Sequence, residues 1–300
     1  MSDDRSTHLV ERAAARLRNE AGLAEAEAAP PLPAPPPSPA PSPAGTDNAP
    51  LTPASADNAE TSPPFVSLAR LVDAGLVVRG ARNRTTEEYR VCVGRLVRSL
   101  RQLRAGAANL VMVTSPRPGE GKSFSVLNMA ASIALNGVSE VLLIDCDSKP
   151  GSLSTELGLK DLPGLADLAA DPAKPVSAAI RATEVPGLFV LPIGRSPQDS
   201  DGITKKMLNT IERVAQTYPH HVVLLDTPPC LSTSDSSTIA QIVDLAVMVV
   251  QAERTQRSEI EAALEILQHC PHIVMMLNQL RARNSSSFGH YSYSYYGHTA

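Results

Sequence analysis

The sequence contains no tryptophan and only four cysteines among its 300 residues. The cysteines stand far apart and form no Cys-x-x-Cys pair: Cys92, Cys146, Cys230 and Cys270. This spacing argues against a metal knuckle and against a disulfide framework. We therefore expect the chain to work in a reducing compartment such as the cytoplasm.

A strong positive charge and long apolar runs are also missing. The formal net charge is −4, whereas dedicated nucleic-acid-binding domains usually carry a basic excess, so we expect no nucleic-acid partner. No stretch approaches the roughly 18 apolar residues of a membrane-spanning helix. Residues 1–20 hold no apolar core of the kind found in secretory signals. If the chain works at a membrane, we expect another protein to bring it there.

Composition divides the chain into four parts. Residues 1–28 are rich in alanine, glutamate and arginine and predict a short helical segment, either solvated or partner-binding. Residues 29–64 are dominated by proline and alanine, and because proline removes backbone donors and fixes φ, we expect a disordered linker. Residues 65–280 carry the pattern of a folded domain. Residues 281–300 form a serine- and tyrosine-rich tail that we expect to be flexible.

Within the folded domain, short apolar runs alternate with amphipathic stretches. The runs predict strands and the amphipathic stretches predict helices. The expected strands are 109–114, 140–144, 188–193, 221–225, 245–250 and 273–277, and the expected helices are 86–104, 122–136, 203–218 and 258–269. Uninterrupted apolar strands are typical of parallel sheets that helices cover on both faces. The alternation therefore predicts an α/β fold with a doubly wound, mostly parallel sheet.

A glycine-rich loop joins the first expected strand to the next helix and reads Pro-Gly-Glu-Gly-Lys-Ser over residues 118–123. Glycines let successive backbone N–H groups surround a phosphate, and the following helix directs its amino-terminal dipole at the anion. Lys122 would add a positive charge and Ser123 a hydroxyl for Mg²⁺. Pro116 stands where the strict P-loop pattern has glycine. We expect ATP to bind along this run, at Gly119, Glu120, Gly121, Lys122, Ser123 and Phe124.

Two further strands end in carboxylates. Asp145 and Asp147 follow one apolar strand, and Asp226 ends another, directly before Thr-Pro-Pro. In open parallel sheets, the carboxyl ends of the strands face the ligand crevice. We expect Asp145 and Asp147 to point the same way, because they are two residues apart on an extended chain. Beside a phosphate site, such carboxylates suit Mg²⁺ binding or proton transfer.

The loop at 118–123, the run Leu-Leu-Ile-Asp-Cys-Asp at 142–147, the run Leu-Leu-Asp-Thr-Pro-Pro at 224–229 and the tyrosine cluster together resemble the bacterial tyrosine kinases. The resemblance covers roughly residues 80–296. It implies a P-loop fold in which the three motifs are Walker A, Walker A′ and Walker B. It also implies an ATP-dependent autokinase that regulates exopolysaccharide or capsule biosynthesis.

The resemblance further implies a role for each motif. Lys122 would stabilise the transferred phosphoryl group, and Asp145 and Asp147 would bind metal and orient or deprotonate the tyrosine hydroxyl. The implied Mg²⁺ ligands are Ser123, Asp145 and Asp226. Clustered tyrosines are uncommon in a chain with 3% aromatic residues. The implied acceptors, phosphorylated between subunits, are Tyr291, Tyr293, Tyr295 and Tyr296.

The implied assembly is a homo-oligomeric ring at the inner membrane, on its cytoplasmic side. Implied partners are a separate membrane adaptor of the chain-length-determinant type and a cognate tyrosine phosphatase. In the family's interface motif, Glu-x-x-Arg-x-x-Arg, Glu87 and Arg90 match, but Val93 replaces the second arginine. Lys149 stands where the Walker A′ motif usually has arginine, which keeps the charge but loses bidentate geometry.

Two other functions stay open. A partition- or positioning-type ATPase would hydrolyse ATP without modifying protein, although Arg117 and Pro118 differ from the Lys-Gly that begins its loop. A regulatory pseudokinase of the same family would bind nucleotide and a partner while transferring little phosphate. Lys149 and Val93 motivate that second alternative.

Overall fold

The computed structural model describes residues 66–68, 71, 76, 84–103, 109–149, 151–195 and 202–280. The expected helical segment at 1–28, the linker at 29–64 and the tail at 281–300 lie outside the described residues. None of the helices in the described ranges combines the length and apolarity that crossing a membrane would require.

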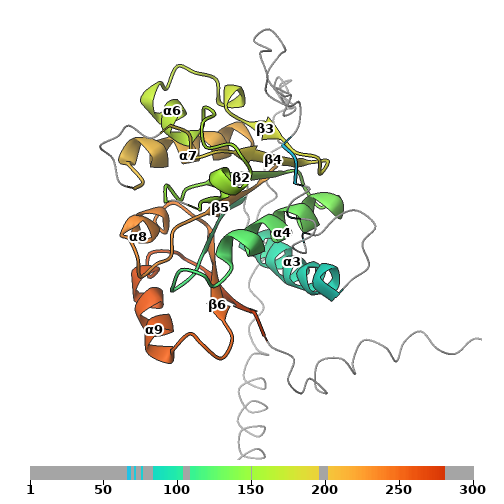
Figure 1. The fold of residues 1–300 in the computed structure, drawn as a ribbon, viewed down its shortest axis with the longest axis vertical. Coiled ribbons are helices and arrows are strands. Elements are labelled where there is room, and N and C mark those ends of the chain that lie inside the picture. Colours follow the sequence, from blue (N-terminus) through green and yellow to red (C-terminus); the bar gives the residue numbers. More distant parts are fainter. Residues whose placement is uncertain are drawn as a thin grey trace, which may run out of the picture. The chain divides into compact units, whose positions relative to one another are not determined.

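A seven-stranded sheet organises the described residues (Figure 1). Its strands lie in the order β3-β4-β2-β5-β1-β6-β7, and every neighbouring pair is parallel except β3 with β4. The strands are β1 Asn109–Thr114, β2 Val141–Asp145, β3 Arg181–Ala182, β4 Leu188–Leu191, β5 Val222–Asp226, β6 Leu245–Gln251 and β7 Ile273–Asn278. The predicted α/β fold with a doubly wound, mostly parallel sheet is therefore confirmed.

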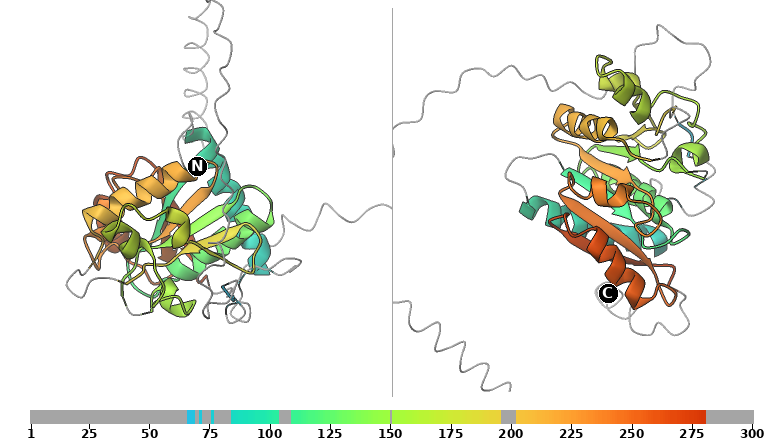
Figure 2. Two further views of the ribbon diagram at one scale, coloured as in Figure 1. Left: turned by 90° about the horizontal axis from the view of Figure 1, so that it is seen from above. Right: turned by 90° about the vertical axis from the view of Figure 1, so that its left-hand side faces the viewer.

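Helices cover both faces of this sheet (Figures 1 and 2). On one face lie α3 Arg84–Leu103 and α4 Lys122–Leu135, and on the other lie α6 Leu165–Ala170, α7 Lys205–Thr217, α8 Asp235–Ile239 and α9 Arg257–Ile266. Every residue of β2 and β5 is buried between these layers. That double burial is why the two strands are uninterrupted aliphatic runs before their final aspartates.

Helix α3 attaches to the domain through one buried stripe: Tyr89, Val93, Leu96 and Leu100. The Tyr89 hydroxyl donates to Ser125 Oγ at 3.3 Å, which ties α3 to the helix that follows the phosphate loop. Glu87 and Arg90 are exposed and form an ion pair at 3.7 Å. Val93, by contrast, is buried, so an arginine at that position would meet the core rather than a neighbouring subunit.

The sequence patterns missed the shortest elements. These are the two-residue strand β3, helices α6 and α8, helix α5 Leu153–Glu156 and the 3₁₀ turn η1 Val176–Ala178. Each spans fewer than two helical turns or only two strand residues, so no hydrophobic period can be read from it. The longer predicted strands and helices are all present, with strand ends within two residues of those expected.

Candidate functional site

Three chain segments meet at the carboxyl edge of the sheet. The phosphate loop follows β1, the Asp145–Asp147 segment follows β2, and Asp226 ends β5. The parallel register pairs Asp145 with Asp226 across β2 and β5, and Val113 of β1 with Asp226. Since parallel strands finish on the same side, these motifs from distant parts of the sequence lie side by side.

The phosphate loop takes its shape from two glycines. Gly119 and Gly121 have φ values of 83° and 87°, in the left-handed region that favours glycine. Gly121 is also the N-cap of α4, and no side chain there caps the helix amides. The 14-residue α4 therefore begins at the loop without a side-chain cap, and the first-turn amides of such a helix can bind an anion.

Lys122 is the centre of the site. Its Nζ lies 3.0 Å from Asp147 Oδ2 and 3.3 Å from Asp226 Oδ1, and it donates to Ser123 Oγ at 3.1 Å. The lysine side chain is 12% exposed, and those of Asp147 and Asp226 are 8% and 0% exposed. One ammonium group therefore compensates two carboxylates that would be costly to bury alone.

The electrostatics follow from this crowding. Burial raises the pKa of Asp226 to about 7, against the lowering effect of the Lys122 charge. Burial lowers the pKa of Lys122, but attraction to Asp226 and Asp147 outweighs it, so the net shift is upward. Asp226 Oδ2 is buried and has no hydrogen-bond partner among the described residues. The site thus holds a firmly charged lysine beside a carboxyl group that is easily protonated.

Asp145 faces the backbone of its own loop. Its Oδ1 accepts from the Asp147 N–H at 3.0 Å, and its Oδ2 accepts from the Ser154 N–H at 2.7 Å. The side chain is fully buried, and this burial raises its pKa. Asp147 contacts Lys122, whereas Asp145 braces the segment that carries Asp147. The two aspartates therefore do not share one direction, unlike the expectation for an extended chain, because the chain leaves the strand at Asp145.

The described side chains include no group of three or more His, Cys, Asp or Glu residues placed to hold a metal ion. Three hard oxygen donors nevertheless lie around the lysine: the Ser123 hydroxyl and the carboxylates of Asp147 and Asp226. The buried, unpartnered Asp226 Oδ2 can accept a further cationic ligand. Mg²⁺ is usually held by one or two protein oxygens together with phosphates and waters, so this donor set fits it.

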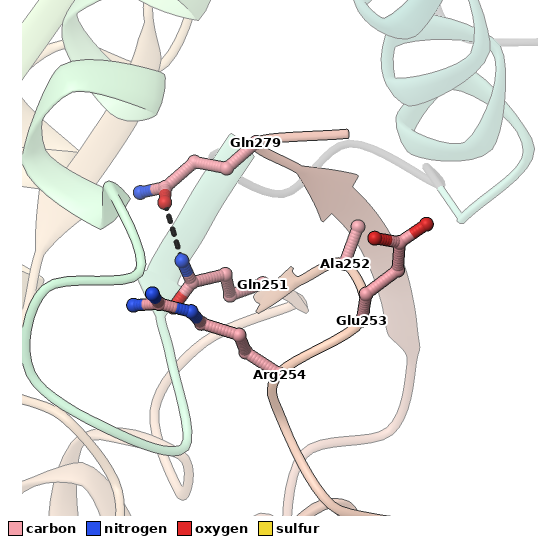
Figure 3. A pocket seen from close by; sticks show the side chains of 5 residues that line it. All are labelled: Gln251, Ala252, Glu253, Arg254 and Gln279. Carbon is pink, nitrogen blue, oxygen red and sulfur yellow. Dashed lines mark hydrogen bonds between the residues drawn. The ribbon is translucent and has the colours of Figure 1, made fainter. Parts of the chain in front are cut away.

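A cavity of about 170 Å³ lies at the ends of β6 and β7 (Figure 3). Its lining residues are Gln251, Ala252, Glu253, Arg254 and Gln279. The Gln251 Nε2 donates to Gln279 Oε1 at 2.6 Å, and Gln279 Nε2 donates to the Gly119 carbonyl at 3.0 Å. The cavity therefore adjoins the phosphate loop. The sequence interpretation missed it, although polar residues directly after two apolar strands were the available signal.

The remaining predicted site residues that the structure describes do not contact the Lys122 ammonium group. Phe124 is in the first turn of α4, where its carbonyl accepts from Asn128 Nδ2 at 3.0 Å. Glu87 and Arg90 lie on α3 and are not among the residues around Lys122. Lys149 is exposed, and its backbone N–H donates to Asp147 Oδ1 at 3.2 Å. The predicted acceptors lie outside the described residues: Tyr291, Tyr293, Tyr295 and Tyr296.

No protein-family model matches the chain. Among curated proteins, it is 34% identical over 201 residues to the "Putative tyrosine-protein kinase EpsB" of Ralstonia solanacearum, covering 64% of this chain and 26% of that protein. It is 32% identical over 190 residues to the "Tyrosine-protein kinase CpsD" of Streptococcus agalactiae, covering 60% of this chain and 76% of that protein. The chain spans about a quarter of the length of the EpsB proteins and of the Acinetobacter johnsonii kinase ptk that it matches.

Solved structures show the same fold. The kinase domain of the Escherichia coli tyrosine kinase ETK aligns with a TM-score of 0.58 at 20% identity, over 75% of this chain and 92% of that one. The kinase domain of VpsO aligns with a TM-score of 0.54 at 28% identity, over 66% of this chain and 95% of that one. The described residues thus have the architecture of these kinase domains.

The charge balance around Lys122 predicts a pH-dependent cost of removing the lysine. In Lys122→Met, the two carboxylates lose their cation, and the free energy of unfolding should fall by about 3 kcal/mol at pH 8. At pH 5 the loss should be smaller. The pKa of Asp226 is already raised to about 7 and rises further without the lysine, so the folded variant holds this proton at pH 5. Urea unfolding of the ligand-free protein at both pH values measures the difference.

The sign of this effect follows from linkage. A carboxyl group whose folded pKa exceeds its unfolded value binds more protons when folded, so its contribution to stability declines as pH rises through that interval. Lys205→Met, at the exposed start of α7, is the matched control and should show an equal, small change at both pH values. Equal losses at pH 5 and pH 8 in Lys122→Met would contradict the assignment.

Proposed function

The chain belongs to the family of bacterial tyrosine-protein kinases, and we propose that it is an ATP-dependent protein-tyrosine autokinase. The observation that carries the proposal is the position of Lys122, held between Asp147 and Asp226 at the mouth of a glycine-rich loop. Phosphoryl transfer depends mainly on positioning and charge neutralisation, and a mobile lysine with neighbouring carboxylates supplies both. Control of exopolysaccharide or capsule biosynthesis is proposed on the same family membership.

Binding of the triphosphate is the first step assigned to this chain's residues. The loop amides at the start of α4 point at the anion, and Lys122 exchanges its carboxylate partners for phosphate oxygens. This exchange keeps the ammonium compensated in both states. The nucleoside is assigned to the cavity between Gln251, Arg254 and Gln279, because that cavity adjoins the loop at Gly119.

Metal binding is assigned to Ser123 and Asp226. Once Lys122 has moved to the phosphates, the Asp226 carboxylate is free to ionise against a divalent cation. Mg²⁺, when bound, supplies neutralisation of the phosphate charge. Asp145 was also a candidate ligand in the sequence interpretation. Its two oxygens each already accept a backbone N–H, which favours a supporting role for it instead.

Asp147 is the residue we assign to the tyrosine hydroxyl. Its Oδ1 accepts the Lys149 N–H, and its Oδ2 faces Lys122, so it is released when the lysine turns to phosphate. A carboxylate in that position can orient the incoming hydroxyl and accept its proton. Asp145 positions Asp147 through the 3.0 Å backbone hydrogen bond.

Acceptors and partners are proposed from the family. The acceptors are the four tail tyrosines at 291, 293, 295 and 296, phosphorylated between subunits. The exposed pair Glu87 and Arg90 on α3 is the proposed subunit contact, leading to a ring. A membrane adaptor would hold the assembly at the cytoplasmic side of the inner membrane, and a cognate tyrosine phosphatase would reverse the modification.

A second candidate function is a nucleotide-binding regulatory pseudokinase. Two observations favour it. Lys149 is exposed and contacts Asp147 through its backbone, so it supplies no bidentate arginine at the site. Position 93 is a buried valine, so α3 does not present the second arginine of the family's interface motif at its surface. Such a protein would bind ATP through Lys122 without labelling its tail.

Mixing two forms of the chain tests the autokinase proposal. One form carries Lys122→Met and an intact tail, and the other has an intact phosphate loop with its four tail tyrosines changed to phenylalanine. After incubation with ATP and Mg²⁺, transfer between subunits should place phosphotyrosine on the Lys122→Met chain, as read by phosphosite mass spectrometry. If the wild-type chain by itself becomes labelled but the mixture of the two variants does not, transfer occurs within one chain. ATP binding by the wild type without any phosphotyrosine would favour the pseudokinase.

The different surroundings of the two aspartates predict different defects. Asp147→Asn should lower kcat for tail phosphorylation about 100-fold, since proton transfer typically contributes at least that much. Asp145→Asn leaves one acceptor oxygen for two buried N–H donors, so it should also lower the free energy of unfolding, by about 1–3 kcal/mol. Single-turnover kinetics and urea unfolding measure both. A full loss of kcat in Asp145→Asn at wild-type stability would instead give Asp145 the direct role.

A further inference from the structure

Glu120 is an acidic residue in a loop that we expect to bind an anion, and the residue is only 2% exposed. Its Oε2 accepts the backbone N–H of Arg117 at 2.8 Å. Its Oε1 contacts the hydroxyl of Thr255, in the connection between β6 and α9. The carboxylate is therefore engaged by the loop backbone and by a second segment 135 residues away in sequence.

The hydrogen bonds at Thr255 have a defined direction. Its Oγ1 accepts the backbone N–H of Gln251 at 3.1 Å. A carboxylate can only accept, so the single hydroxyl proton of Thr255 is donated to Glu120. Hydrogen bonds to an ionised acceptor are among the stronger ones in proteins. Through Thr255, the contact thus joins the phosphate loop to Gln251, which lines the cavity.

A second path returns to the loop through β7. Gln251 donates to Gln279 (dashed line in Figure 3). The donor and acceptor atoms are 2.6 Å apart, and Gln279 in turn donates to the Gly119 carbonyl at 3.0 Å. Asn278 Nδ2 also donates to the Glu120 carbonyl at 2.9 Å. The hydrogen bonds therefore form a closed ring from Glu120 through Thr255, Gln251 and Gln279 to Gly119.

Packing leaves the loop little freedom to leave this position. A Cβ added at Gly121 would clash with Asn278 Nδ2, and the positive φ of Gly121 also favours glycine there. A side chain at this position would therefore displace the Asn278 amide at the end of β7 from the Glu120 carbonyl. Arg117 also forms an ion pair with Glu259 of α9 at 3.4 Å. That pair is partly exposed and contributes little by itself. The buried Glu120 contact is the stronger attachment on this side.

We propose that Glu120 is a positioning residue that holds the phosphate loop in register with the cavity at Gln251 and Gln279. One nucleotide can then engage both with a single geometry. The inference rests on the proposed function, because it concerns how the same site recognises a nucleoside triphosphate. Holding two subsites in fixed relation lets one ligand gain from both without a further ordering cost. The base and the triphosphate therefore bind cooperatively, through the Glu120–Thr255 contact.

The test compares ATP with inorganic tripolyphosphate, which has no base, both with Mg²⁺ and the full chain. In Thr255→Val, ATP affinity should fall about tenfold, as expected for loss of a hydrogen bond to a charged group. Tripolyphosphate affinity should change less than about twofold, because the loop itself remains intact. Calorimetric titration gives both dissociation constants. The readout is the dissociation constant of tripolyphosphate divided by that of ATP, which should fall in Thr255→Val. A role in loop folding alone would weaken both ligands equally and leave that ratio unchanged.

Four further variants sharpen the test. Thr255→Ser keeps the hydroxyl and should restore the wild-type ratio, and Thr217→Val removes a hydroxyl at the end of α7 as the matched control. Glu120→Gln offers one acceptor oxygen to two donors and should lower the ratio as Thr255→Val does. In the double variant, Glu120→Gln with Thr255→Val, the ratio should fall no further than in the more affected single variant, because both changes break the same contact.

An unchanged ratio in Thr255→Val and Glu120→Gln would overturn the proposal, whether both affinities fall together or neither falls. Additive effects in the double variant would do the same. If the wild-type chain binds tripolyphosphate and ATP equally, the cavity does not recognise the base and the inference fails, while phosphate binding by the loop stands. If it binds neither ligand, the proposed function itself is wrong.

Discussion

The site depends on one buried ammonium group and two carboxylates. Lys122 Nζ lies 3.0 Å from Asp147 and 3.3 Å from Asp226, and all three side chains are largely shielded from water. Neither carboxylate could be buried in its ionised form without that charge. Because the three groups come from α4, the segment after β2 and the end of β5, their attraction also holds the carboxyl edge of the sheet together. A ligand that draws the lysine away must supply equivalent charge, which a triphosphate with Mg²⁺ does.

Two sets of buried contacts beside this charged centre hold neighbouring segments in place. On one side, Asp145 uses both of its oxygens to hold the segment that presents Asp147. On the other side, Glu120 and Thr255 attach the phosphate loop to the β6–α9 connection, next to the cavity of Figure 3. The groups we assign to chemistry therefore rest on buried polar contacts that have no direct part in it. Such contacts keep a site within the narrow tolerances that transfer reactions need.

The sequence predicted the sheet and the edge at which the motifs meet, because buried parallel strands such as β2 and β5 are unmistakable aliphatic runs. It also predicted that Asp145, Asp147 and Asp226 all lie at the phosphate site beside Lys122. The structure places Asp147 and Asp226 there. The sequence could not predict that Asp145 would turn toward Ser154, since that depends on how the chain leaves the strand. Nor could it predict the contact of Glu120 with Thr255, because nothing local marks two residues so far apart as neighbours. The sequence showed that valine stands at position 93, but not that this side chain is buried in the core.

We propose that Lys122 exchanges its two carboxylates for phosphate when nucleotide binds. Nuclear magnetic resonance of the Lys122 side-chain ammonium, labelled with ¹⁵N and assigned by its loss in Lys122→Met, measures this most directly. We predict a slowly exchanging ammonium signal in the ligand-free protein, because the group is buried and its pKa is raised. That signal should move to a new position as ATP with Mg²⁺ saturates the site. A signal that stays in place at full ATP occupancy would contradict the account, since the lysine would then have kept its carboxylate partners.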